Sequence, residues 1–194
     1  MNRQQLIGVT LTGLATMMPL GALSSGSALG QTSIDLTTFR NTALSKHNTY
    51  RKTHHSPALT ISNSANSTAQ SWAEHLAATG VFEHSSSSQR NGAGENIYAS
   101  YTTATSIDPD TLANDAVESW YEEVKDYNYA NPGFASNTGH FTQVVWKGST
   151  QLGCGAAQGT ATIEGTKYNA FYVVCQYDPA GNMSGDFPAN VSKP

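Results

Sequence analysis

Four polar residues in the chain are of the types that bind a divalent metal ion: His84, Glu95, Glu123 and His140. Neutral imidazole nitrogens prefer zinc or copper, and a carboxylate completes the ligand set or orients a ligating histidine. The spacings between the four are long, so the spacing alone does not bring them together. Ordinary hydrogen-bonded polar residues remain the alternative interpretation.

The neighbouring Glu122 and Glu123 differ in the side of the helix on which they are expected. At 100° per residue, Glu123 flanks the Ala116 side of an apolar helical stripe, whereas Glu122 points nearly opposite. We therefore predict that Glu123 faces inward and that Glu122 is a solvated surface charge.

The remaining histidines have simpler interpretations. His54 and His55 lie in a polar turn before Pro57, and His75 lies on the polar side of a helix, so we expect all three at the surface. His47 lies on an apolar helix face, which favours a hydrogen-bonded core residue over a metal ligand.

Common enzyme motifs are missing from the sequence. It contains no His-Glu-x-x-His zinc helix, no Gly-x-Ser-x-Gly nucleophile turn and no phosphate-binding loop. The serines at 85–88 lie beside His84, but their polar loop shows no sign of the rigid turn and oxyanion hole that a nucleophile needs. Serine hydrolase chemistry is therefore not expected.

The first thirty residues have the layout of a secretory signal peptide. Arg3 is followed by an uncharged stretch over 6–23 and by small residues at 27–30, so we expect cleavage after residue 30. An uncleaved membrane anchor is the alternative, weakened by several threonines and by Pro19. The mature protein should be secreted without a stable membrane span, to the extracellular space or to a bacterial periplasm.

Residues 31–194 are predicted to form a single domain. All 14 acidic residues and all basic residues except Arg3 lie in this part, which gives a net charge of about −5. Lysine and arginine are nowhere clustered, so binding of nucleic acid is not expected.

Three amphipathic helices are predicted, each with its own start signal. The first has an apolar stripe from Leu36 to His47, with Ser33 or Asp35 as its N-cap. The second has a stripe from Ala65 to Leu76, with Ser62 or Asn63 as its N-cap and Gly80 just past its end. The third has a stripe from Ala113 to Val124 and begins at Asp108-Pro109. Residues 85–94 and 128–138 are predicted loops, and 139–146 is too short to assign. Helices before strands indicate an α+β fold.

Two cysteines lie in the strand-like segments 151–157 and 167–177. A hairpin folded about Glu164-Gly165 places Cys154 opposite Cys175, and a secreted protein meets oxidising conditions in which a disulfide persists. We predict this bond, worth about 3 kcal/mol for a loop of roughly twenty residues. Two buried free thiols are the alternative.

Two long segments resemble the signatures of the CAP family, which includes cysteine-rich secretory proteins, antigen 5 and plant pathogenesis-related proteins. They are Gly139 to Thr150 (GHFTQVVWKGST) and Tyr172 to Met183 (YVVCQYDPAGNM). Supporting matches are His47-Asn48 with Arg51, Pro57 with Leu59, Ala69-Gln70 with Trp72-Ala73, Gly94 to Ile97, and Trp120-Tyr121 with Glu123. The resemblance covers residues 40 to 185, and the stretch from Tyr127 to His140 is most similar to the cysteine-poor Golgi-associated pathogenesis-related proteins.

The resemblance implies a three-layer α-β-α sandwich with a large central cleft. Its floor would hold His84, Glu95, Glu123 and His140, with the histidines as direct ligands of zinc or a similar ion and the glutamates as partners, directly or through water. No catalytic residue is assigned. The implied function is a binding module for a sterol, another lipid or a cell-surface partner. The alternative is a metal-assisted hydrolase, a peptidase, with Glu95 or Glu123 as general base.

Overall fold

The computed structural model describes residues 34–194, so the predicted signal peptide at 1–30 lies outside the described residues. None of the helices in this range has the length and apolar character of a membrane span. The elements in chain order are α1 (Leu36–Thr53), β1 (Thr60–Ile61), α2 (Asn63–Thr79), β2 (Gly94–Thr102), α3 (Pro109–Tyr121), the 3-10 helix η1 (Glu122–Asp126), α4 (Gly139–Val145), β3 (Gln151–Ile163), β4 (Thr166–Asp178) and α5 (Phe187–Asn190).

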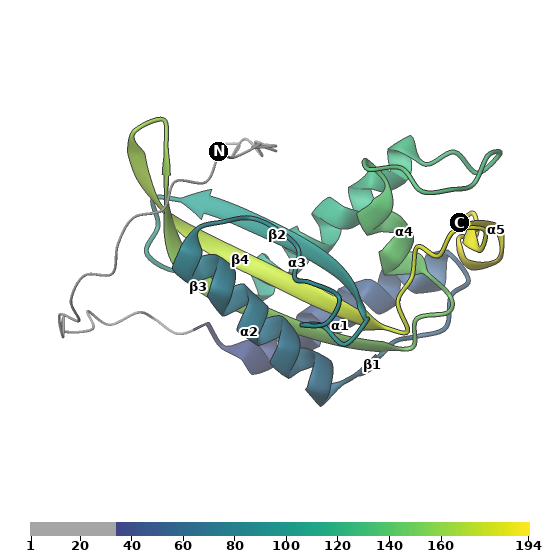
Figure 1. Cartoon of the computed structure of the whole chain (residues 1–194), viewed down its shortest axis with the longest axis horizontal. Coiled ribbons are helices and arrows are strands. Elements are labelled where there is room, and N and C mark those ends of the chain that lie inside the picture. The colour runs from purple at the N-terminus through teal and green to yellow at the C-terminus, as the bar shows by residue number, and fades with distance from the viewer. Residues whose placement is uncertain (1–33) are drawn as a thin grey trace. The chain divides into compact units, whose positions relative to one another are not determined.

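A four-stranded sheet forms the middle layer, in the order β1-β3-β4-β2 (Figure 1). Strands β3 and β4 form an antiparallel hairpin, β2 pairs antiparallel with β4, and β1 pairs parallel with β3. Helix α2 covers one face over Ile97, Tyr172 and Val174, and α1, α3 and α4 cover the other over Phe171 and Val173. The predicted α-β-α sandwich is confirmed.

The three predicted helices begin at predicted caps. The carboxylate of Asp35 accepts the Thr37 and Thr38 amides, Ser62 accepts the Ala65 amide, and Asp108 accepts the Thr111 amide. Helix α2 ends at Gly80, whose φ of 69° is left-handed and suits glycine. The third helix ends earlier than its stripe suggests, because the chain tightens into η1 after Tyr121.

Among the elements that were not predicted, β2 and α4 carry site residues. Strand β2 lies between the second and third helices, so the strands do not all follow the helices. Its residues Asn96, Ile97 and Tyr98 are all buried, because helices cover both faces, and this removes the alternation that marks a half-buried strand. Residues 139–145, left unassigned from the sequence, form α4.

The surface prediction for His54 was wrong. This side chain is fully buried, with Nδ1 bonded to the Ser192 carbonyl at 2.7 Å and Nε2 to the Tyr121 hydroxyl at 3.0 Å. Its ring also packs edge-on against Phe141. The residues that cover His54 come from distant parts of the chain, which the polarity of its own turn does not reveal.

The disulfide joins Cys154 and Cys175, which are paired across β3 and β4. The hairpin turns at Glu164-Gly165, where both residues have positive φ. Both cysteines are buried. The predicted bond and the predicted hairpin midpoint are confirmed.

A buried arginine fixes the end of α4. From α1, Arg51 donates Nη1 to the carbonyls of Val144 (3.0 Å) and Trp146 (2.8 Å), Nη2 to Ser149 (2.8 Å) and Nε to Pro57 (2.8 Å). Burial lowers the pKa of Arg51 to about 10, so it remains a cation at neutral pH. A cation is favourable at the C-terminal carbonyls of a helix, and here all its acceptors are carbonyl oxygens.

The core histidine is confirmed. His47 Nδ1 lies 2.7 Å from the Ala43 carbonyl, which only accepts, so Nδ1 carries the hydrogen and Nε2 accepts from the Tyr177 hydroxyl at 2.8 Å. That hydroxyl accepts from Asn96 Nδ2. Burial lowers the pKa of His47 to about 4, with Arg51 contributing as a nearby positive charge.

Removing the disulfide should destabilise the fold without changing it. We expect the double variant Cys154→Ala/Cys175→Ala to lose about 3 kcal/mol of unfolding free energy, because the unfolded chain is no longer closed into a loop. Urea denaturation followed by circular dichroism measures the loss. An unchanged unfolding midpoint would contradict a stabilising bond.

His47 should make stability fall with acid. The unfolded histidine gains its proton near its ordinary pKa of 6.5 and the folded one only near 4, so the unfolded state binds more protons in between. Stability present above pH 6.5 is therefore lost as the pH falls towards 4, by about 3 kcal/mol. Denaturation at a series of pH values should show a shallower slope for His47→Gln than for the wild type, while the exposed control His75→Gln keeps the wild-type slope.

Candidate metal site

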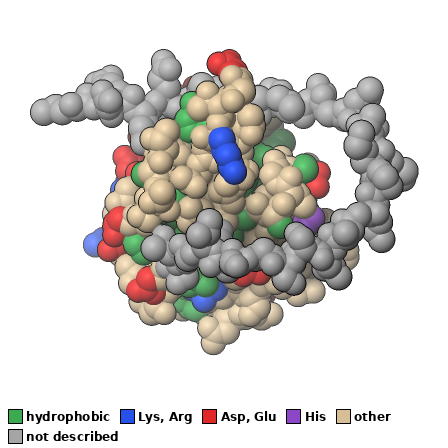
Figure 2. Space-filling view, turned by 90° about the vertical axis from the view of Figure 1, so that its left-hand side faces the viewer, with side chains coloured by type: hydrophobic (Ala, Val, Ile, Leu, Met, Phe, Trp, Pro, Cys, Tyr) green, Lys and Arg blue, Asp and Glu red, His purple; other side chains and the backbone are tan. Residues whose placement is uncertain are grey.

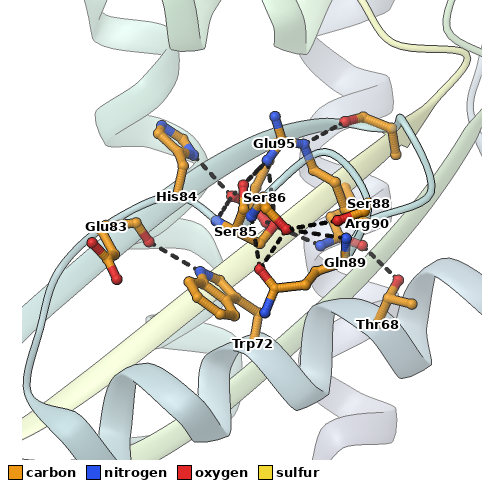
Figure 3. A network of polar contacts seen from close by, with 12 residues as sticks. Thr68, Trp72, Glu83, His84, Ser85, Ser86, Ser88, Gln89, Arg90 and Glu95 are labelled. Carbon is orange, nitrogen blue, oxygen red and sulfur yellow. Dashed lines mark hydrogen bonds and ion pairs between the residues drawn. The ribbon is translucent and has the colours of Figure 1, made fainter.

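The first pair of candidate residues joins the loop after α2 to the start of β2. The carboxylate of Glu95 is only 1% exposed, and its Oε1 lies 2.9 Å from His84 Nδ1. It also accepts from the Ser85 amide at 2.9 Å and the Ser85 hydroxyl at 2.6 Å, and from Gln176 Nε2 at 3.0 Å. Figure 3 shows these contacts converging on Glu95 while the His84 ring lies at the edge of the group.

Further residues hold this carboxylate in place. Gln176 is oriented by the Thr68 hydroxyl, which donates to its Oε1 at 2.6 Å, and Arg90 Nη1 lies 4.0 Å from Glu95. Burial alone would raise the pKa of Glu95, but the hydrogen bonds from His84, Ser85 and Gln176 outweigh burial and hold it below its ordinary value. Glu95 is thus an ionised, buried and fully bonded carboxylate.

The second pair joins η1 to α4. Glu123 Oε1 lies 2.7 Å from His140 Nδ1, and Oε2 accepts the backbone amides of His140 (2.9 Å) and Phe141 (3.0 Å). Thr138, at the N-cap of α4, makes no capping bond with its side chain. Glu123 therefore acts as the N-terminal cap of α4 from another element, and the same carboxylate orients the histidine of that helix.

The helical spacing assigned the two glutamates correctly. The side chain of Glu123 is 20% exposed and that of Glu122 is 48% exposed, with Glu122 paired to Lys125 at the surface.

Behind His140, the indole of Trp120 lies parallel to the imidazole with ring centres 6.3 Å apart. Asn96 Nδ2 donates to the His140 carbonyl at 3.1 Å. His140 is therefore fixed on both its ring and its backbone.

Both histidines are held in the orientation of a metal ligand. A carboxylate only accepts, so Nδ1 of His84 and of His140 carries the hydrogen, and in the neutral form of each ring the lone pair lies on Nε2. Neither Nε2 has a hydrogen-bond partner among residues 34–194. A carboxylate behind Nδ1 with Nε2 free is the usual arrangement around a histidine that binds zinc.

The structure brings the four residues together as two pairs. Across residues 34–194, no group of three or more histidine, cysteine, aspartate and glutamate side chains could hold a metal ion. Two surface hollows border the pairs, one lined by α2 and residues 85–89 and one by residues 126–138, and none of the four residues lines either. Among these residues the structure therefore shows two separate His–Glu pairs and no complete set of protein ligands for a metal ion.

Several residues that build the pairs were not nominated from the sequence. They are Ser85, Gln176 and Thr68 around Glu95, and Asn96 behind His140. One signal was available: Gln176 is an uncharged polar residue within a buried strand, and a buried polar side chain needs a partner. The partner itself could not be identified without the register of β2 against β4.

Known proteins share this architecture. The family model of CAP, the cysteine-rich secretory protein family, matches residues 44–177. The chain belongs to the CAP family. The match spans every element from within α1 through β4, so it includes both His–Glu pairs of this CAP domain.

Individual relatives agree with this assignment. The chain is 39% identical to human Golgi-associated plant pathogenesis-related protein 1, in an alignment that covers 80% of this chain and 94% of the relative. It is 36% identical to Protein PRY2 of Saccharomyces cerevisiae, in an alignment that covers 79% of this chain and 41% of PRY2. Thus it spans less than half of PRY2. The crystal structure of NaASP2 with Zn2+ superposes with a TM-score of 0.63 at 27% identity, covering 81% of this chain and 87% of that one.

Loss of the Glu123 carboxylate should loosen α4. We expect Glu123→Ala to cost roughly 1–3 kcal/mol, because two backbone amides lose their acceptor. Hydrogen exchange at the His140 and Phe141 amides should accelerate. The matched control is Glu122→Ala, which removes an exposed ion pair and should change stability by about 0.5 kcal/mol or less. Equal effects of the two substitutions would contradict the capping role.

Proposed function

We propose that this CAP domain is a secreted binding module, without catalytic activity, in which His84 and His140 bind zinc or a similar divalent ion through Nε2. The observation that carries this proposal is the pairing of each Nδ1 with a carboxylate, at 2.9 Å for His84 and 2.7 Å for His140. Glu95 and Glu123 orient the imidazoles and raise their basicity from behind. The bound ion would supply a positive charge that attracts an oxygen atom of a partner.

The carboxylates are better suited to orienting histidines than to activating water. A general base needs a lone pair within hydrogen-bond reach of the reacting water. Glu95 already accepts from His84, Ser85 and Gln176, and Glu123 from His140 and Phe141. A hydrolase using Glu95 would first have to break one of the bonds that hold the fold, whereas Glu123 keeps one lone pair on Oε1, so it is Glu95 that favours binding over metal-assisted hydrolysis.

An exposed apolar surface beside His140 suggests the class of partner. Phe134 is 66% exposed and Met183 is 53% exposed. The Phe134 ring lies against Gly139, and Asn182, next to Met183, donates Nδ2 to the Gly139 carbonyl at 2.9 Å. Apolar side chains around the start of α4 suit a sterol, another lipid or the apolar part of a cell-surface protein.

The charge distribution does not suit nucleic acid. The whole chain has a net charge of −4, and on the face drawn in Figure 2 the basic side chains are separated from one another by acidic and uncharged ones. A nucleic-acid-binding protein would gather its basic residues into a patch or stripe. A lipid or protein partner is consistent with this surface.

Zinc titration of the mature protein by calorimetry tests the proposed ion site. We expect wild type to bind zinc, His84→Ala/His140→Ala to lose binding, and Glu95→Gln to bind about 10–100-fold more weakly, because its histidine loses its orienting carboxylate. The control His75→Ala removes an exposed histidine outside the pairs and should bind as wild type does. Unchanged zinc affinity in the double variant would refute the assignment.

Peptide and lipid assays separate the two functions. Sterol or fatty-acid capture that persists in Glu123→Gln, with no peptide turnover by either protein, agrees with a binding module. Chelator-sensitive turnover that Glu123→Gln abolishes would instead establish the hydrolase.

A further inference from the structure

The surface hollow lined by α2 and residues 85–89 lies on the α2 face of the sheet, away from the exposed apolar residues beside His140. It is an open hollow of about 440 Å³ between helix α2 and the loop before β2, within the roughly 300–1,000 Å³ common for small-molecule sites. Its lining residues are Ser67, Thr68, Ser71, Trp72, His75, Ser85 and Gln89. No lysine, arginine, aspartate or glutamate lines it, so its ligand should be uncharged.

One wall of this α2 pocket is aromatic. The rings of Trp72 and His75 are stacked, with centres 4.3 Å apart and planes inclined by 17°. Trp72 Nε1 donates to the Glu83 carbonyl at 3.0 Å, which fixes the indole (Figure 3). His75 is exposed and has no hydrogen bond from its ring to another residue of the described chain. Trp72 is only 8% exposed and is covered by His75, so the flat surface that the wall offers is the exposed His75 ring with its free imidazole nitrogens, supported by the fixed indole.

The rim carries neutral donors and acceptors. The Ser71 hydroxyl has no partner within residues 34–194. Gln89 Oε1 accepts from the Ser86 amide at 2.8 Å and hydroxyl at 2.7 Å, which orients the amide and leaves Nε2 as a donor. Ser67 donates to the Asn63 carbonyl and keeps its acceptor lone pairs. Donors and acceptors thus surround the aromatic wall.

We propose that the α2 pocket binds a neutral carbohydrate. A pyranose ring has a face of C–H groups that packs on an aromatic surface, and hydroxyls at its edge that both donate and accept hydrogen bonds. The pocket offers the His75 ring, backed by Trp72, for the face and Ser71 and Gln89 for the edge. An anionic ligand would lack a basic partner, and a purely apolar ligand would leave these polar groups unpaired.

This site is separate from the proposed ion site, although the two share a wall. Ser85 and Thr68 line the pocket and also hold Glu95, the first directly and the second through Gln176. Test substitutions should therefore avoid them. Ser71 and His75 have no hydrogen bond to the Glu95 group, so changing them leaves that group intact.

Carbohydrate binding is measured by titrating the isotopically labelled mature protein, in the presence of a chelator, with chitotriose, cellotriose and laminaritriose. We expect at least one to shift the amide signals of residues 67–75 and 85–89 saturably. Ser71→Ala/His75→Ala should weaken that binding about tenfold or more. Ser64→Ala, an exposed serine on the same helix outside the pocket, should leave it unchanged. Gln89→Ala tests the opposite rim if the double variant does not fold.

Two results of this titration would contradict carbohydrate binding at the α2 pocket. No saturable shift with any of the three sugars, or shifts confined to other residues, would overturn the proposal. Binding of a sulfated heparin disaccharide in place of the neutral sugars would overturn the class of ligand. Because the chelator removes any metal ion, failure here is distinct from failure of the zinc titration.

Discussion

Helix α4 has seven residues and is held by charged groups at both ends. A helix this short is unstable by itself in water, so its position depends on tertiary contacts. Arg51 binds the carbonyls of Val144 and Trp146 at its C-terminal end, and Glu123 accepts the His140 and Phe141 amides at its N-terminal end. The positive and negative charges match the helix dipole. The location of His140 follows from this arrangement.

The carboxylates therefore have two roles each. Glu123 caps α4 and orients His140, while Glu95 ties the loop after α2 to β2 and β4 and orients His84. The hydrogen bonds of Glu95 and Glu123 that stabilise the fold also orient the imidazoles of His84 and His140, so no further side chains are needed to orient the two candidate ligands. Glu95 accepts two hydrogen bonds on each oxygen, which explains why this carboxylate is poorly placed to act on water. Structural stability and ligand orientation are coupled in this CAP domain.

Local features of the fold could be predicted from the sequence, and long-range ones could not. Helix caps and the hairpin about Glu164-Gly165 depend on neighbouring residues, and were found. Strand β2, α4 and the burial of His54 depend on distant segments that cover them, and were missed. The four site residues followed from their chemical type and the family resemblance, but their separation into pairs needed coordinates. So did Arg51's role, because its acceptors lie up to 98 positions away.

The account depends on which ring nitrogen carries the hydrogen in His84 and His140. Long-range proton–nitrogen NMR correlation on the metal-free protein identifies this directly in the neutral imidazoles. We predict hydrogen on Nδ1 and a free lone pair on Nε2 for both residues, with His47 as an internal reference of the same tautomer. Hydrogen on Nε2 in either His84 or His140 would contradict the central claim that the carboxylates prepare these histidines to bind an ion.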